Sequence, residues 1–156
     1  MKNLILFADG GSRGNPGPSA CGFVIYEFAD TDFESLKTLT LNKFQPKFKL
    51  ILEKGEFLGT KTNNQAEWQG LILGVRTILS KFEKEKVNLK VFLDSQLVVR
   101  QVLGQYKVKN LELKELFVEF KGLIKSLQSF EIEHIYRDQN KVADKMVNLA
   151  LDKKLD

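Results

Sequence analysis

Leu4-Ile5-Leu6-Phe7-Ala8-Asp9 is a run of five apolar residues that ends in an acid. A short continuous apolar run followed by turn-forming glycines, here Gly10-Gly11, is typical of a buried strand. Val87 to Asp94 repeats this pattern, since it is rich in apolar residues and also ends in an acid. The two segments therefore predict two buried strands, each with a carboxylate at its end.

A strong helical pattern lies between these two strands. The apolar residues that recur at intervals of three and four are Trp68, Leu71, Ile72, Val75, Ile78, Leu79 and Phe82. Asn64 stands three residues before Glu67, which is capping-box spacing, and Thr62 and Asn63 are rival caps. A helix between two strands allows them to pair in parallel through a right-handed crossover. Parallel pairing places Asp9 and Asp94 together at the edge where open α/β sheets bind ligands.

The rest of the chain alternates between strand and helix patterns. Apolar runs predict strands at residues 20–27, 48–58 and 130–136, and helical spacing predicts helices at residues 95–103, 113–127 and 142–151. This order of strands and helices is typical of an α/β domain with a mixed sheet. No linker or low-complexity tract is evident, so we expect a single domain over residues 1–156.

The region after the second strand is harder to interpret. Lys54-Gly55 interrupts the third strand and favours a bulge there. Residues 28–47 are expected to form an extended β-hairpin or an insertion. Within them, residues 36–41 are a candidate for lengthening the hairpin.

Composition limits the class of protein. The 24 lysines and arginines outnumber the 20 acids and give a net charge of +4, which is compatible with a polyanionic partner without requiring one. No apolar run approaches the length of a membrane span, and the first run is too short for a signal-peptide core. We therefore expect a cytoplasmic protein with no membrane partner. Cys21 is the only cysteine, and we expect it to be a buried structural thiol.

Two further acids border predicted helices. Glu67 lies at the margin of an apolar stripe, and Asp144 lies at the start of the terminal helix. Together with Asp9 and Asp94 they can meet at one sheet edge, where their repulsion favours binding of Mg²⁺ or Mn²⁺. Each acid also has a structural explanation. Asp9 suits a turn, and Asp94 suits a helix cap. Glu67 fits a capping box, and the helix dipole favours Asp144.

Four short strings decide between these alternatives. They are Asp9-Gly10-Gly11 followed by Asn15-Pro16-Gly17, Thr62-Asn63-Asn64-Gln65-Ala66-Glu67, Asp94-Ser95-Gln96, and Asn140-Lys141-Val142-Ala143-Asp144. In this order they resemble the four signatures of the type 1 ribonuclease H family. The last string has the form common to archaeal, plant and some bacterial members. The resemblance covers nearly the whole chain except about residues 28–47.

The resemblance implies a ribonuclease H-like fold, with a five-stranded mixed sheet flanked by helices. It also implies an enzyme that cuts the RNA strand of RNA–DNA hybrids and leaves 3′-hydroxyl and 5′-phosphate ends. By position, Asp9, Glu67, Asp94 and Asp144 are the implied catalytic residues and metal ligands. Two Mg²⁺ or Mn²⁺ ions are the expected cofactors. The expected partner is the hybrid, bound by a monomer.

Substrate choice sets a further requirement. An enzyme that cuts RNA but not DNA must sense the 2′-hydroxyl, which is read across a wide, shallow minor groove. Asn63, Asn64 and the Gly11 backbone can donate hydrogen bonds to this hydroxyl or accept them from it. The alternative for the two asparagines is helix capping. Asn15 and Ser95 complete the expected substrate-binding surface.

Two features of the family pattern are missing. Many bacterial relatives carry a basic protrusion ahead of the third helix and a catalytic histidine after the last strand, and this chain has neither. His134 lies within the last predicted strand, where a packed, hydrogen-bonded role is favoured. Arg137 is the candidate for the missing role, through a contact with phosphate. Lys107 and Lys109 are candidate phosphate contacts, although a solvated pair of charges is an equal alternative.

Two other functions stay open on the sequence alone. A binding module of the same fold would hold hybrids or structured RNA without turnover, although the presence of all four acids argues against it. A related nuclease would cut double-stranded RNA or junction DNA. The asparagine pair beside Glu67 favours an RNA strand but leaves added cleavage of double-stranded RNA open.

Overall fold

The computed structural model describes residues 1–28, 33–39 and 48–155, and its centre is a five-stranded sheet in the order β3-β2-β1-β4-β5. The strands are β1 (Lys2–Ser12), β2 (Gly17–Phe28), β3 (Phe48–Lys61), β4 (Val87–Leu93) and β5 (Ser129–His134). The first three strands pair antiparallel, whereas β1–β4 and β4–β5 pair in parallel. The predicted mixed sheet and the parallel pairing of β1 with β4 are therefore confirmed. The predicted end of the first strand at Asp9 is wrong, because β1 continues to Ser12 through its pairing with β2.

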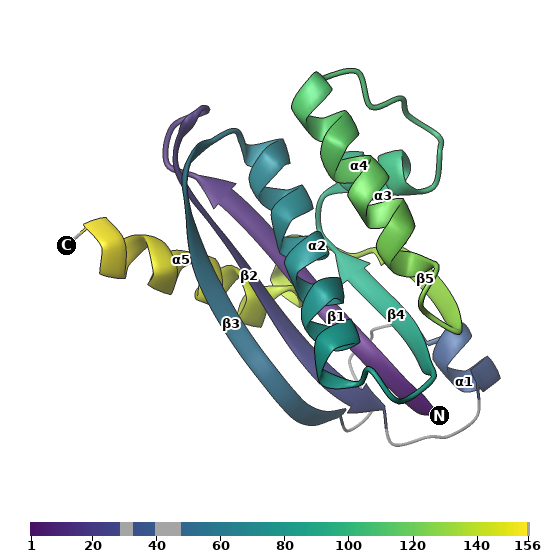
Figure 1. Cartoon of the computed structure of the whole chain (residues 1–156). Helices are drawn as coiled ribbons and strands as arrows, with labels where there is room; N and C mark the ends of the chain where they lie inside the picture. The colour runs from purple at the N-terminus through teal and green to yellow at the C-terminus, as the bar shows by residue number, and fades with distance from the viewer. Residues whose placement is uncertain (29–32, 40–47, 156) are drawn as a thin grey trace.

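The helices cover both faces of this sheet. They are α1 (Phe33–Lys37), α2 (Asn63–Lys81), α3 (Gln96–Val102), α4 (Leu111–Ile124) and α5 (Lys141–Leu155), with a 3₁₀ turn at Arg137–Gln139. In Figure 1, α2, α3 and α4 lie on one side of the sheet, and α5 crosses the other side. None of the helices in the described residues is both long and apolar enough to cross a membrane.

Alternation along the central strands divides the core between the two faces. In β1, Leu4, Leu6 and Ala8 pack into the cluster that contains the α2 side chains, whereas Ile5 and Phe7 pack into a second cluster. This is the period of two that a strand covered on both faces requires. Residues that follow the strands are thereby held at a fixed edge of the sheet.

The contact between α2 and β1 is unusually close. A Cβ atom added to Gly70 would lie 2.5 Å from the Asp9 carbonyl oxygen, and one added to Gly10 would overlap the backbone of Ala66 and Glu67. Side chains at these two positions would separate the helix from the strand. The glycines therefore let the backbone of Glu67 approach the backbone of Asp9.

The start of α2 differs from the favoured prediction. Thr62, not Asn64, is the N-cap, because its hydroxyl accepts a hydrogen bond from Gln65 N while the Gln65 side chain accepts one from Thr62 N. This reciprocal pair is a capping box with glutamine at its fourth position. Glu67 is consequently not needed as a capping residue.

Two predictions in the strand region also need correction. Lys54 and Gly55 pair regularly with β2, and the register shifts lie instead opposite Ser19/Ala20 and Ile25/Tyr26. Gly55 is needed for another reason, because a Cβ atom there would collide with the Met146 backbone of α5. Within the proposed hairpin extension, residues 36 and 37 belong to α1. Residues 29–32 and 40–47 lie outside the described residues, so the rest of that prediction is not tested.

Candidate active site

Three acids meet where the parallel pairing of β1 with β4 ends, beside the first turns of α2. Asp9, Glu67 and Asp94 each place a carboxylate oxygen within 4.8 Å of the other two. Asp9 lies in β1, Asp94 directly follows β4, and Glu67 lies in α2. The three side chains thus come from three elements that are distant in sequence, as the topology predicts.

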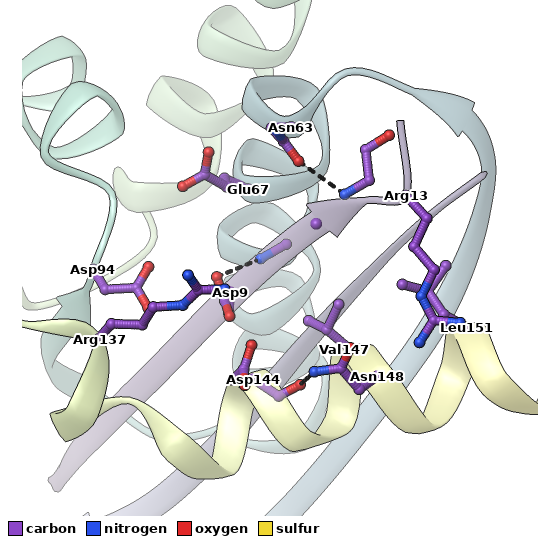
Figure 2. A pocket seen from close by; sticks show the side chains of 13 residues that line it. Asp9, Arg13, Asn63, Glu67, Asp94, Arg137, Asp144, Val147, Asn148 and Leu151 are labelled. Atoms are coloured by element: carbon purple, nitrogen blue, oxygen red, sulfur yellow. Dashed lines mark hydrogen bonds between the residues drawn. The ribbon is translucent and has the colours of Figure 1, made fainter. Parts of the chain in front are cut away.

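Asp144 lines the same hollow from the opposite side of the sheet edge. The hollow has a volume of about 540 Å³, and all four acids contribute to its lining. Figure 2 shows Asp144 on α5 facing Asp9, with Glu67 on the far side of Asp9. Asp144 is not part of the group of three oxygens within 4.8 Å. The hollow is therefore bordered by acids from both helical layers.

Each of the three clustered carboxylates is held by a hydrogen bond. Asp9 Oδ1 accepts one from Gly10 N at 2.9 Å, and the Ser95 hydroxyl bonds the Glu67 carboxylate. Asn140 Nδ2 donates to Asp94 Oδ2 at 3.3 Å and to the Ala8 carbonyl oxygen at 2.9 Å. Asn140 is only 1% exposed, so it is a buried link between β1, Asp94 and the start of α5.

Crowding and burial make the charged forms of these acids costly. Burial raises the pKa of Asp9 to about 8, and the neighbouring charges of Asp94, Asp144 and Glu67 add to this. Burial raises the pKa of Glu67 to about 7, although the Ser95 hydrogen bond opposes the shift. The pKa of Asp94 is also raised, mainly by burial. In the absence of a counter-charge, the site therefore holds protons at neutral pH.

The predicted substrate residues divide into two groups. Gly11 and Asn63 line the hollow, whereas Asn15, Asn64 and Ser95 do not. Asn15 Oδ1 accepts a hydrogen bond from Asn63 N at 3.1 Å, and Ser95 is the N-cap of α3.

Asn64 and the two lysines are likewise absent from the lining of the hollow. The side-chain oxygen of Asn64 is buried without a hydrogen-bond partner. Lys107 and Lys109 line a separate hollow of about 410 Å³ beside α4. The sequence motifs therefore combine residues at the acids with residues that brace the surrounding loops.

Arg137 and His134 both lie close to Asp94. Arg137 lines the hollow, and its positive charge opposes the rise in the Asp94 pKa. His134 is half-buried at the end of β5, where it pairs with Leu93, and its ring meets the Tyr136 ring edge-on at a centroid distance of 5.9 Å. The predicted place of His134 in the last strand is confirmed.

Three polar residues of the hollow, Ser12, Arg13 and Asn148, were not singled out by the sequence. Asn148 follows Asp144 by one helical turn, and its Nδ2 donates to the Asp144 carbonyl oxygen at 3.1 Å. Its spacing of four residues from a candidate ligand was a usable signal. Arg13 lines the hollow from the β1–β2 turn. It carried no comparable signal, because side-chain direction in a turn has no simple period.

Comparisons with known proteins agree with this geometry. A family model described as "Reverse transcriptase-like" matches residues 46–150. The chain is 34% identical over 149 residues to the bifunctional protein Rv2228c of Mycobacterium tuberculosis, covering 96% of this chain and 35% of that protein. It is 32% identical to ribonuclease HI of Halobacterium salinarum, covering 94% of this chain and 63% of that protein. The chain thus spans about a third of the length of the mycobacterial relative.

A solved structure extends the likeness to three dimensions. LC11-RNase H1 in complex with an RNA/DNA hybrid superposes with a TM-score of 0.80 and 34% identity, covering 98% of this chain and 99% of that one. The five-stranded mixed sheet, the four sequence motifs and the match over nearly the whole of both chains lead to one assignment. The chain belongs to the type 1 ribonuclease H family.

Proposed function

We propose that this protein is an endoribonuclease that hydrolyses the RNA strand of RNA–DNA hybrids. The observation that carries the proposal is the convergence of Asp9, Glu67 and Asp94 within 4.8 Å, in a hollow that Asp144 also lines. The hybrid seen bound to LC11-RNase H1, a relative matched over nearly its whole length, supports this choice of substrate.

The donor set fits hard divalent cations. The clustered groups are all carboxylates, which Mg²⁺ and Mn²⁺ prefer, and their raised pKa values support the proposal of a positive counter-charge. Asp9, Glu67, Asp94 and Asp144 would hold two such ions when substrate is bound. The ions would supply activation of water and stabilisation of the leaving oxygen, which is consistent with 3′-hydroxyl and 5′-phosphate products.

The chain's own contribution is to orient these groups before substrate arrives. The hydrogen bonds from Gly10 N, Ser95 and Asn140 restrict how the three carboxylates can turn. Supporting contacts of this kind commonly contribute about 10- to 100-fold to metal affinity or activity. We expect an effect of the same order here. At the rim, Asn63 Oδ1 accepts from Ser12 N at 2.9 Å, which leaves the Asn63 NH₂ group to donate to a 2′-hydroxyl.

Cationic residues in the hollow of the acids and in the separate hollow beside α4 would bind the backbone of the hybrid. We assign Arg137 to a phosphate of the cut strand, where it would assist product departure. Lys107 and Lys109 border a hollow that also contains Tyr106, and we assign them to phosphates farther from the cut.

One panel of assays tests the proposed function. Hybrid, double-stranded RNA, single-stranded RNA and duplex DNA are incubated with Mg²⁺, Mn²⁺ or chelator. We expect metal-dependent cleavage of the hybrid, lost by more than about 100-fold in Asp94→Asn because a candidate ligand is removed. An Arg137→Ala enzyme with unchanged turnover would refute the role given to Arg137.

The same panel separates the rival functions. Tight hybrid binding without cleavage in either metal would identify a binding module. Equal cleavage of double-stranded RNA would identify a nuclease of wider specificity. The proposal also includes a cytoplasmic monomer, which cell fractionation and sedimentation of the purified protein would check.

A further inference from the structure

The hollow that contains the acids has a second end that the proposed chemistry does not use. Among the described residues that line it, the positively charged ones are Arg137 and Arg13. In Figure 2, Arg137 lies beside Asp94, whereas Arg13 descends from the β1–β2 turn toward Leu151 on α5. The acids are therefore flanked by one arginine on each side.

Asp152 holds the Arg13 guanidinium at this end. Arg13 Nη2 lies 2.6 Å from Asp152 Oδ1, and the two side chains are 42% and 56% exposed. Ion pairs this exposed contribute little to stability, because water and salt screen them. A doubly contacting anion such as a phosphate diester competes well for a guanidinium, whose planar fork of donors matches phosphate oxygens.

The backbone that carries Arg13 is fixed relative to the acids. Ser12 N donates to Asn63 Oδ1 at 2.9 Å, and Asn63 N donates to Asn15 Oδ1 at 3.1 Å. Arg13 N also donates to the Pro18 carbonyl oxygen at 2.8 Å. The turn is therefore joined to the first turn of α2, the helix that supplies Glu67. Only the Arg13 side chain has to move to meet a ligand in the hollow.

We propose that Arg13 binds a backbone phosphate of the cut strand, on the side of the metal centre opposite Arg137, and that Asp152 is its placeholder in the free protein. The inference rests on the proposed function. On binding, the guanidinium exchanges the Asp152 carboxylate for the phosphate. Arg13 is thus a substrate-positioning residue that sets the register of the strand across the four acids.

The chain offers a matched control for this ion pair. Arg76 on α2 pairs with Glu119 on α4, and this pair has similar exposure but lies outside the hollow. We would measure hybrid affinity across a salt series for Arg13→Ala, Asp152→Asn and Arg76→Ala. Each variant is made in an Asp94→Asn background, so that the hybrid is not cut during the titration.

The exchange of Asp152 for a phosphate predicts a specific pattern of hybrid affinities among the three variants. Arg13→Ala should weaken binding about 5- to 20-fold at low salt and reduce the slope of log K against log salt by about one, because one phosphate contact is lost. Asp152→Asn should strengthen binding a few-fold by freeing the guanidinium. Arg76→Ala should leave affinity and slope within about twofold of the parent, the range expected of a screened surface charge.

Three outcomes would overturn the inference. An unchanged salt slope in Arg13→Ala, even with a lower melting temperature, would show that the pair only joins α5 to the turn. Asp152→Asn binding as weakly as Arg13→Ala would show that the substrate needs the intact pair. An Asp94→Asn parent that binds no hybrid would overturn the proposed function, and this inference with it.

Discussion

Asp9 is the residue at which folding and function conflict most directly. Its carboxylate is buried, lies close to two other acids, and has a pKa near 8. An aspartate in the unfolded chain ionises near pH 4. Between these two values the folded protein keeps a proton that the unfolded chain releases. The contribution of Asp9 to folding stability without metal is therefore most favourable at low pH and falls as the pH rises from about 4 to about 8.

The Asp9→Asn variant should remove most of this dependence. Asparagine keeps the size of the side chain and its acceptor for Gly10 N but never carries the charge. We expect the metal-free variant to be more stable than the parent at pH 8 by about 2–4 kcal/mol, and equally stable near pH 4. Chemical denaturation in the presence of chelator, repeated across this pH range, measures the difference in stability between the variant and the parent. A parent whose stability rises from pH 5 to pH 8 would contradict the pKa assignment.

At the scale of elements, the α2–β1 contact sets the spacing of the acids. Gly70 faces the Asp9 carbonyl oxygen at a distance that leaves no room for a methyl group. Gly70→Ala should push the helix from the strand and thereby move Glu67 away from Asp9. We expect a loss of about 1–3 kcal/mol in stability, as is usual for overpacking. Hybrid-cleaving activity should fall further than the fraction of unfolded protein explains.

Gly122 is the matched control for this substitution. It also lies in a helix, α4, but a Cβ atom added there would meet nothing within 4 Å. Gly122→Ala should therefore gain about 0.5–1 kcal/mol from helix propensity, with no change in activity. Thermal unfolding and hybrid cleavage, measured side by side, compare the Gly70→Ala and Gly122→Ala variants. Equal effects of the two alanines would show that the close contact does not govern the site.

The same elements show what the sequence could and could not reveal. Periodicity located the strand that carries Asp9 and the strand that precedes Asp94, because a buried strand leaves a continuous apolar run. It did not show that β1 continues past Asp9 to Ser12. It did not identify Thr62 as the cap, because Thr62, Asn63 and Asn64 can all accept the same backbone hydrogen bond. It misplaced the bulge at Gly55, whose glycine is required by the close approach of α5.

Long-range contacts account for what the sequence missed at the site. The motifs located all four acids of the hollow, since each string marks the end or beginning of an element. They gave no sign that Asn140 bonds both the Ala8 carbonyl oxygen and Asp94. They also gave no sign that Arg13 meets Asp152, which lies 139 positions along the chain. Contacts of this kind depend on the angle at which α5 crosses the sheet, and no local pattern records that angle.

At the scale of the whole molecule, Cys21 reports on the integrity of the sheet. It is fully buried in β2, and burial raises the pKa of its thiol to about 12. A thiol reagent should reach it only when the sheet opens, so modification at pH 8 should be at least about 100-fold slower than in denaturant. Added Mg²⁺ should slow it further by binding only the folded state. Native protein that reacts as fast as unfolded protein would contradict this burial.

The order in which the acids occur along the chain has a consequence for the cell. Asp9 is made early and Asp144 near the end of the described residues, with β4 and α2 needed between them. A half-made chain on its ribosome, surrounded by ribosomal RNA and its own message, has some of the ligands but no assembled centre. Under the proposed function, the nuclease is therefore inert until α5 has been made and has docked on the sheet.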